Sequence, residues 1–119
     1  MQRLINALRN SLRALGRLLG SETAFQQEIV LLVLAIPVGW FVATSWRGYA
    51  LLLGVILLLI VVEVLNTAIE AACNALSREF HKDIQLAKDC GSLAVLISIA
   101  IAFGVWALAI AERIIGHSL

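Results

Sequence analysis

Charged residues are scarce in this sequence. Of its 119 residues, 14% are charged and 61% are apolar, whereas a soluble domain carries roughly 25% charged residues. The net charge is only +1, so the composition gives no reason to expect a nucleic-acid partner. We therefore expect the hydrocarbon interior of a membrane, rather than water, to be the main solvent of this chain.

Known nucleotide-binding motifs and cysteine clusters are also missing. The chain has no Walker A loop, no glycine-rich strand motif of the soluble kinases and no H-R-D loop. Its two cysteines, Cys73 and Cys90, lack metal-ligand spacing, so neither a disulfide framework nor a zinc site is indicated. A nucleotide site in this chain must therefore have another architecture.

Long apolar runs are what the chain has instead. Three of them approach or exceed the ~20 residues that a helix needs to cross a bilayer. The first contains Pro37 and Gly39, which bilayer helices tolerate. We found no internal repeat and no strand-like alternation. The sequence thus predicts an all-α membrane protein, one domain over 1–119, with transmembrane helices at 29–46, 50–76 and 87–111.

The first twenty residues have a different pattern. Five leucines recur at helical spacing, and three arginines follow another face: Leu4, Leu8, Leu12, Leu15 and Leu19, with Arg9, Arg13 and Arg17. Such a helix lies on a membrane surface, where the leucines enter the acyl boundary and the arginines meet anionic headgroups. Residues 1–20 are therefore predicted to form an amphipathic surface helix.

The basic residues also predict the orientation. Three spans place the termini on opposite sides, and the side with more basic residues faces the cytoplasm. The side with more basic residues carries Arg3, Arg9, Arg13, Arg17, Arg78, Lys82 and Lys88, whereas the opposite side carries Arg47 and Arg113. We therefore expect a cytoplasmic N-terminus and a periplasmic C-terminus. Aromatic residues flank Arg47 and Gly48, which predicts a tight interfacial turn at these two residues.

Acidic and amide side chains interrupt the second span. In the segment E-V-L-N-T-A-I-E, Glu63, Asn66 and Glu70 share one helix face, because they are three and four residues apart. A charge at the centre of a span costs ~2.5–3.5 kcal/mol and often marks a functional path. Glu63 is the deeper carboxylate and suits a base that accepts an alcohol proton. Glu70 lies ~10 Å away along the axis, nearer the cytoplasm, within reach of ions and nucleotide.

Two further segments supply groups at the same depth. Lys88 and Asp89, in L-A-K-D-C-G-S, begin the third span, and a lysine there can hold phosphate. Glu22 and Glu28 flank the start of the first span. Mg²⁺ is usually bound by one or two carboxylates together with phosphate oxygens and waters, so Glu22 and Glu70 are candidate ligands. These are the groups that metal-assisted phosphoryl transfer from ATP requires.

Several motifs, in order and spacing, resemble the prokaryotic diacylglycerol kinase family. They are E-T-A-F-Q-Q-E at 22–28, V-E-V-L-N-T-A-I-E-A at 62–71, and E-F-H followed by A-K-D-C-G-S-L-A-V. The resemblance implies a homotrimer in the bacterial inner membrane, with active sites at subunit boundaries near the cytoplasmic face. It also implies transfer from MgATP to diacylglycerol, giving phosphatidic acid.

The resemblance also implies a role for individual residues. Glu63 resembles the general base, and Glu22 and Glu70 resemble the metal ligands. Residues similar to those that organise the phosphates are Asn66, Lys88 and Asp89. Residues similar to those around the nucleotide and the headgroup are Arg3, Ser11, Glu79 and His81, with Glu28 in support. The chain departs from the family at Asn74, commonly aspartate, and at Asn6, frequently lysine, and both departures bear on nucleotide affinity.

Two other functions remain open at this stage. An undecaprenol kinase of the same family would use the same residues on an isoprenoid alcohol, although the stretch before A-K-D is closer to the diacylglycerol type. A non-enzymatic membrane subunit would use the carboxylates to join helices, at ~0.6 kcal/mol per contact, or to pass protons. Lys88 and Asp89 would then be a solvated pair. Gly54 and Gly104 are expected to allow close helix approach.

Overall fold

The computed structural model describes residues 1–77, 79 and 81–116, and these form helices without any strand. The helices are α1 (Gln2–Ser21), α2 (Thr23–Val42), α3 (Trp46–Leu76) and α4 (Lys82–Ile115). All but α1 are long and apolar enough to cross a membrane. The predicted all-α membrane fold is therefore confirmed. Arg78, used for the orientation, and Phe80, in the E-F-H motif, lie outside the described residues.

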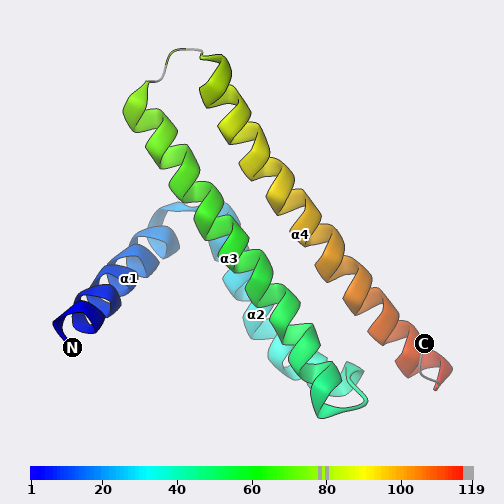
Figure 1. Cartoon of the computed structure of the whole chain (residues 1–119). Helices are drawn as coiled ribbons and strands as arrows, with labels where there is room; N and C mark the ends of the chain where they lie inside the picture. Colours follow the sequence, from blue (N-terminus) through cyan, green and yellow to red (C-terminus); the bar gives the residue numbers. More distant parts are fainter. Residues whose placement is uncertain (78, 80, 117–119) are drawn as a thin grey trace.

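Helix α3 is the centre of the arrangement. It packs against α2 on one side and α4 on another, while α2 and α4 touch each other only slightly. Helix α1 contacts α2 and otherwise projects away from the three long helices (Figure 1). The radius of gyration is 17.4 Å, above the ~13–14 Å of a compact soluble chain of this length. The molecule is thus an elongated helical hairpin with α2 packed against α3.

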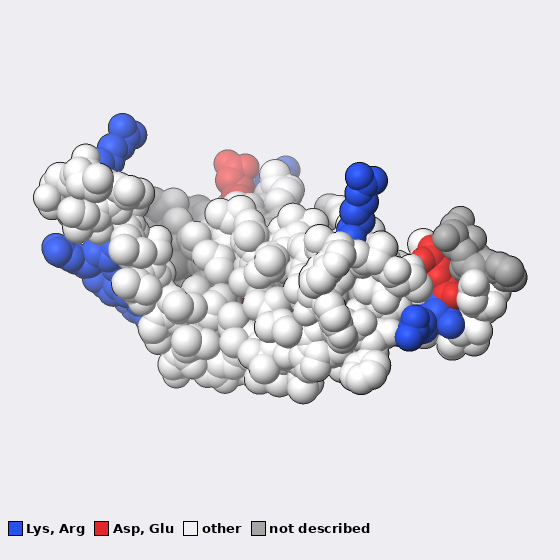
Figure 2. Space-filling model, turned by 90° about the horizontal axis from the view of Figure 1, so that it is seen from below, with Lys and Arg blue, Asp and Glu red and all other residues white. Residues whose placement is uncertain are grey.

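Helix α1 buries no side chain within the chain. The five leucines of the predicted apolar face are exposed, from 67% at Leu4 to 40% at Leu15. Seen from below, the middle of the molecule shows few charged side chains, whereas the arginines of α1 stand out at the left (Figure 2). The leucines and the arginines of α1 follow different faces of the helix, which is the pattern of a helix that lies along a membrane surface.

The turn between α2 and α3 differs from its prediction. It was expected at Arg47 and Gly48, but the non-helical residues are 43–45 and α3 already begins at Trp46. The cause is Ser45, whose Oγ accepts a hydrogen bond from the backbone N–H of Gly48 at 3.0 Å. This N-cap draws Arg47 and Gly48 into the first helical turn.

Helices α3 and α4 are longer than a bilayer requires. At ~1.5 Å per residue, the 31 residues of α3 and the 34 of α4 span about 46 and 51 Å, against a hydrocarbon thickness of ~30 Å. Helix α4 also starts before the predicted 87, with His81 as its N-cap. The end of α3 and the beginning of α4 therefore extend past the start of α2 (Figure 1).

The apolar core lies between α2 and the other long helices, toward the α2–α3 turn. Its buried members on α3 are Leu52, Val55, Ile56 and Leu59. The indole Nε1 of Trp106 donates to the backbone oxygen of Leu52 at 3.1 Å. No described atom lies within 4 Å of a Cβ built at Gly54 or Gly104, so the close approach expected there is not found within this chain. It occurs at Gly39 and Gly91 instead.

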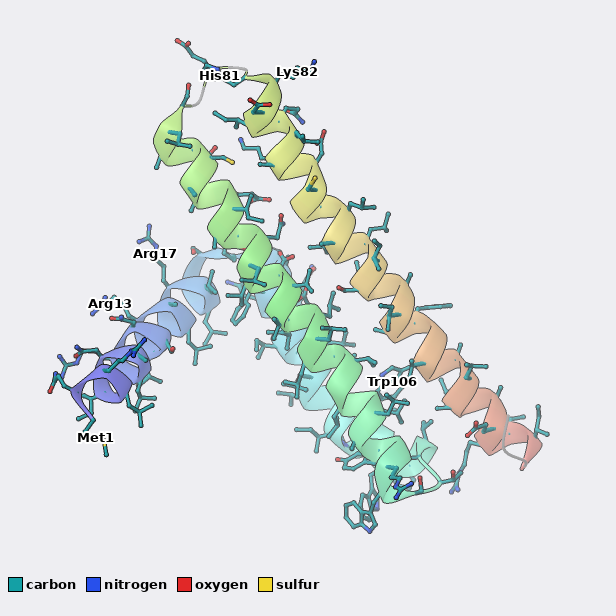
Figure 3. All side chains as sticks on the ribbon, in the orientation of Figure 1. Met1, Arg13, Arg17, His81, Lys82 and Trp106 are labelled. Atoms are coloured by element: carbon teal, nitrogen blue, oxygen red, sulfur yellow. The ribbon has the colours of Figure 1, made fainter. Side chains whose placement is uncertain are left out.

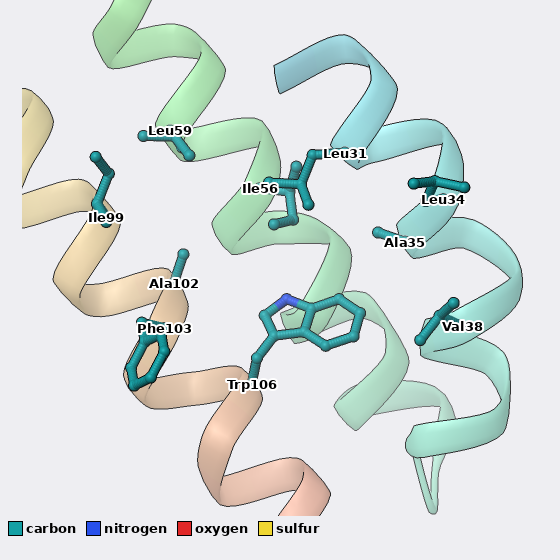
Figure 4. Close-up of a pocket in the computed structure, with 10 residues that line it drawn as sticks. All are labelled: Leu31, Leu34, Ala35, Val38, Ile56, Leu59, Ile99, Ala102, Phe103 and Trp106. Carbon is teal, nitrogen blue, oxygen red and sulfur yellow. The ribbon is translucent and has the colours of Figure 1, made fainter. Parts of the chain in front are cut away.

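A cavity of about 360 Å³ opens between α2, α3 and α4 beside this core (Figure 4). Its ten lining residues are apolar, apart from the indole nitrogen of Trp106, whose hydrogen is already donated to Leu52. A phosphoryl group needs charged or hydrogen-bonding partners. This cavity therefore offers nothing to phosphoryl transfer, and the candidate site lies elsewhere.

Candidate functional site

The buried face of α3 changes from apolar to polar along its length. Leu52, Ile56 and Leu59 continue at helical spacing into Glu63 and Asn66. Both polar side chains are buried, each with an exposed fraction of 8%. The stripe predicted from the sequence is thus the direct continuation of the core face as far as Asn66, while Glu70 is exposed.

Four carboxylates gather where α3 passes the start of α2. Glu63 lies within electrostatic range of Glu22 and Glu70, and Glu28 lies within range of Glu63. Glu22 is the residue between α1 and α2, and Glu28 lies further along α2. Two helices and a junction therefore bring together acidic groups that are far apart in the sequence.

This donor set fits Mg²⁺ in chemistry. Carboxylate oxygens are the hard ligands that Mg²⁺ prefers, and it usually takes only one or two of them, with phosphate and water oxygens. Among the described residues, no three His, Cys, Asp or Glu side chains are grouped closely enough to hold a metal ion alone. A metal at this site would therefore need ligands from the nucleotide, from water or from another chain.

The side chain of Asn66, on α3, lies between α3 and α4 beside Glu70. Its Nδ2 donates to Oε1 of Glu70 at 3.2 Å, as it must, because a carboxylate only accepts hydrogen bonds. Its Oδ1 consequently points at α4, where it is buried and has no partner among the described residues. Oε1 of Glu28 is in the same condition. Buried polar atoms of this kind call for a partner.

Lys88 crosses from α4 to α3. Its Nζ donates to Oδ1 of Asn74 at 3.0 Å, and the side chain is half-buried. The cation therefore stands at the polar end of the α3–α4 pair, held by an uncharged partner. Asp89 is exposed and accepts from Nε2 of Gln85 at 2.9 Å, along the surface of α4.

The remaining predicted site residues are not gathered here by a single chain. Arg3 and Ser11 are exposed on α1, and the hydroxyl of Ser11 donates to the backbone oxygen of Ala7 at 2.8 Å. Glu79 and His81 are exposed at the α3–α4 connection. Figure 3 shows Met1 and His81 at opposite ends of the molecule, so the beginning of α1 lies far from this connection.

Sequence reasoning missed Gly91, which is buried on α4. A Cβ at this position would overlap Oδ1 of Asn66. The one local signal was a glycine inside a helix with no turn nearby, at the C-G-S of the third motif. The reason for that glycine depends on how α3 and α4 pack, which spacing along one helix does not contain.

Residues 9–110 match the model of the family described as prokaryotic diacylglycerol kinase. A protein of Pseudomonas aeruginosa called diacylglycerol kinase is 36% identical over 107 residues, covering 90% of this chain and 87% of the relative. One of Escherichia coli K12 with the same name is 36% identical over 106 residues, covering 89% and 87%. One of Haemophilus influenzae is 34% identical over 103 residues, covering 87% of each.

Proposed function

Since the chain belongs to the prokaryotic diacylglycerol kinase family, we propose that it transfers the γ-phosphate of MgATP to the hydroxyl of diacylglycerol, giving phosphatidic acid and ADP. The observation that carries this proposal is the burial of Glu63 and Asn66 on the core face of a membrane-length helix, beside Glu22, Glu28 and Glu70. Family membership makes the chain an enzyme and sets aside a purely structural membrane subunit.

Glu63 is the group that accepts the proton. The hydroxyl oxygen of diacylglycerol forms a bond to the γ-phosphorus, the bond from that phosphorus to the β–γ bridging oxygen breaks, and the hydroxyl proton passes to the Glu63 carboxylate. Glu63 lies on α3, near Glu22 at the α1–α2 junction and Glu28 of α2, and we expect the hydroxyl of diacylglycerol to reach it from the interfacial region of the membrane. The burial of Glu63 keeps water from competing for the carboxylate.

The phosphates lie on the polar extension of α3 and α4. Lys88 is a point charge for phosphate oxygens, and its bond to Asn74 holds its ammonium group beside α3. Asn66 and Asp89 complete the phosphate surroundings. Glu22 and Glu70 would hold Mg²⁺, which when bound neutralises the charge of the transferring group.

The remaining residues complete the site in the assembled protein. Arg3, Ser11, Glu79 and His81 lie around the nucleotide and headgroup, contributed across the boundaries of a homotrimer. The protein lies in the bacterial inner membrane, with its N-terminus and sites in the cytoplasm and its C-terminus in the periplasm. The excess of basic residues on α1 and at the start of α4 supports this orientation, and the mostly exposed apolar helices support the location in a membrane.

A lipid panel tests the reaction. Purified protein in detergent–lipid micelles receives labelled ATP with either diacylglycerol or undecaprenol, with Mg²⁺ or with an excess of chelator. We expect Mg²⁺-dependent phosphatidic acid and a higher kcat/KM for diacylglycerol. Preferential labelling of undecaprenol would identify the other activity of the family, and no labelling of either lipid would refute the proposed function.

A further inference from the structure

Helix α4 passes close to the polar face of α3 at Gly91. Gly91 and Asn66 are both buried, and a Cβ built on Gly91 would overlap Oδ1 of Asn66 and lie 3.2 Å from its Cγ. We propose that Gly91 is a positioning residue: its missing side chain leaves the room in which the Asn66 carboxamide is held, and through it the Glu70 carboxylate. This inference rests on the proposed function.

The bond between Asn66 and Glu70 depends on that room. Only the orientation with Oδ1 toward α4 lets Nδ2 donate to the acceptor-only carboxylate of Glu70. A methyl group at Gly91 would occupy the place of Oδ1. Because this oxygen is the end of a side chain whose last torsion is soft, the carboxamide would rotate before the helices moved. Rotation removes the hydrogen bond to Glu70 and leaves the backbone in place.

The Glu70 carboxylate would lose its recorded hydrogen bond through this change. It is exposed on α3, and the bond from Asn66 is the hydrogen bond that the structure records for its side chain. Released from it, the carboxylate would sample several rotamers. A misplacement of about 1 Å at a reacting group costs on the order of 10²-fold in rate. Gly91 would thus affect turnover without touching nucleotide or lipid itself.

Glycine is otherwise a poor choice inside this helix, because it weakens a helix relative to alanine. Gly104 provides the matched control: it lies in the same helix, and a Cβ there meets no described atom within 4 Å. The two replacements Gly91→Ala and Gly104→Ala therefore make the same gain in helix propensity. They differ in whether the new methyl group meets Asn66.

The experiment compares these two variants with and without Asn66→Ala. For each, we would measure kcat, KM for both substrates, the half-saturating Mg²⁺ concentration and the unfolding midpoint. The NMR signal of the Asn66 side-chain amide, identified by its loss in Asn66→Ala, would be recorded without metal. We expect Gly91→Ala to lower kcat roughly 10- to 100-fold, to raise the half-saturating Mg²⁺ concentration and to shift the amide signal. Gly104→Ala should match the unsubstituted protein in all of these.

The double variant separates positioning from stability. In the Asn66→Ala background, Gly91→Ala should cost less than about twofold in kcat, because the side chain through which it acts is gone. If Gly91→Ala lowers the unfolding midpoint, Asn66→Ala should restore it. An equal loss in both backgrounds, or Gly91→Ala as active as Gly104→Ala, would overturn the inference and leave the lipid kinase activity of the unsubstituted protein standing.

Discussion

Lys88 is fixed by a neutral side chain. The oxygen of Asn74 accepts its hydrogen bond and orients the ammonium group without cancelling its charge, which stays available to an anionic phosphate. An aspartate at position 74, as the family commonly has, would pair with the lysine and offset part of that charge. In the proposed site, an aspartate at position 74 would thus leave less of the Lys88 charge for a nucleotide phosphate than Asn74 does.

Replacement of Asn74 by alanine should therefore act on nucleotide binding. Without the acceptor, the Lys88 side chain gains rotamer freedom that binding must remove, at about 0.5–1.5 kcal/mol. We expect the KM for ATP to rise roughly 2- to 10-fold, while the KM for diacylglycerol stays unchanged and serves as the internal control. A change in the lipid KM alone would show that Asn74 does not act through Lys88.

At this scale the sequence revealed which residues share a face of one helix and which segments share a depth, but no individual contact between two helices. Glu63 and Asn66 were predicted to share a face because their spacing is local to α3, and the structure buries both. The contacts of Lys88 with Asn74 and of Gly91 with Asn66 depend on the relative translation and rotation of α3 and α4. That register results from packing, so no spacing rule could have found these pairs.

The face that helices α3 and α4 share has an apolar half and a polar half. Toward the α2–α3 turn their shared face is apolar and is fastened by the bond from Trp106 to Leu52. Toward the α3–α4 connection it carries the carboxylates, Asn66 and Lys88. Within a membrane, an interhelical hydrogen bond such as that from Trp106 to Leu52 contributes ~0.6 kcal/mol on average and up to ~1.7 kcal/mol. We therefore expect substitutions in the apolar half to change stability and substitutions in the polar half to change the chemistry.

Replacing Trp106 by phenylalanine tests this division. The variant keeps an aromatic ring in the core but loses the indole donor and the contacts of the second ring, so we expect a loss of at least about 0.5–1.5 kcal/mol in the free energy of unfolding, measured by titration with a denaturing detergent. Turnover at saturating substrates should remain within about twofold. A large fall in kcat with unchanged stability would show that the apolar half takes part in the chemistry.

The existence of the three long helices also followed from the sequence, although most of their ends did not. The apolar runs identified the three long helices, since hydropathy and length alone decide that a segment suits a bilayer. The ends were less accurate. Ser45 placed the turn earlier than the aromatic cluster suggested, because a helix start can be decided by a single capping hydrogen bond that composition does not reveal. Helix α4 begins after His81, which makes no side-chain capping bond.

The whole chain buries little of its apolar surface. Among the residues that the structure describes, eight hydrophobic side chains are buried, while large ones on every helix remain exposed, so lipid or further copies of the chain must cover them. Both kinds of cover are equally apolar, which is why neither sequence nor single chain reveals the number of subunits. The residues of α1 that stand apart from the carboxylates fit a site completed by a neighbouring chain.

Orientation in the membrane can be measured directly. In a background of Cys73→Ser and Cys90→Ser, single cysteines at Asp83 and at Thr44 lie at opposite ends of the long helices. In right-side-out vesicles, we expect a membrane-impermeant maleimide to label Thr44→Cys and not Asp83→Cys. Inverted vesicles should reverse the result, because basic residues gather on the Asp83 side. Labelling of Asp83→Cys from the periplasmic side would contradict the proposed topology.

The central claim is that the carboxylate of Glu63 is retained inside the membrane to take the hydroxyl proton, at a cost to stability. The most direct measurement is the turnover of Glu63→Gln, alongside its unfolding midpoint and Asp83→Asn as an exposed carboxylate control. The account predicts a kcat lowered roughly 10²- to 10⁴-fold, an unfolding midpoint equal to or above that of the unsubstituted protein, and a control that keeps its activity. A Glu63→Gln protein that phosphorylates diacylglycerol at the unsubstituted rate would contradict it.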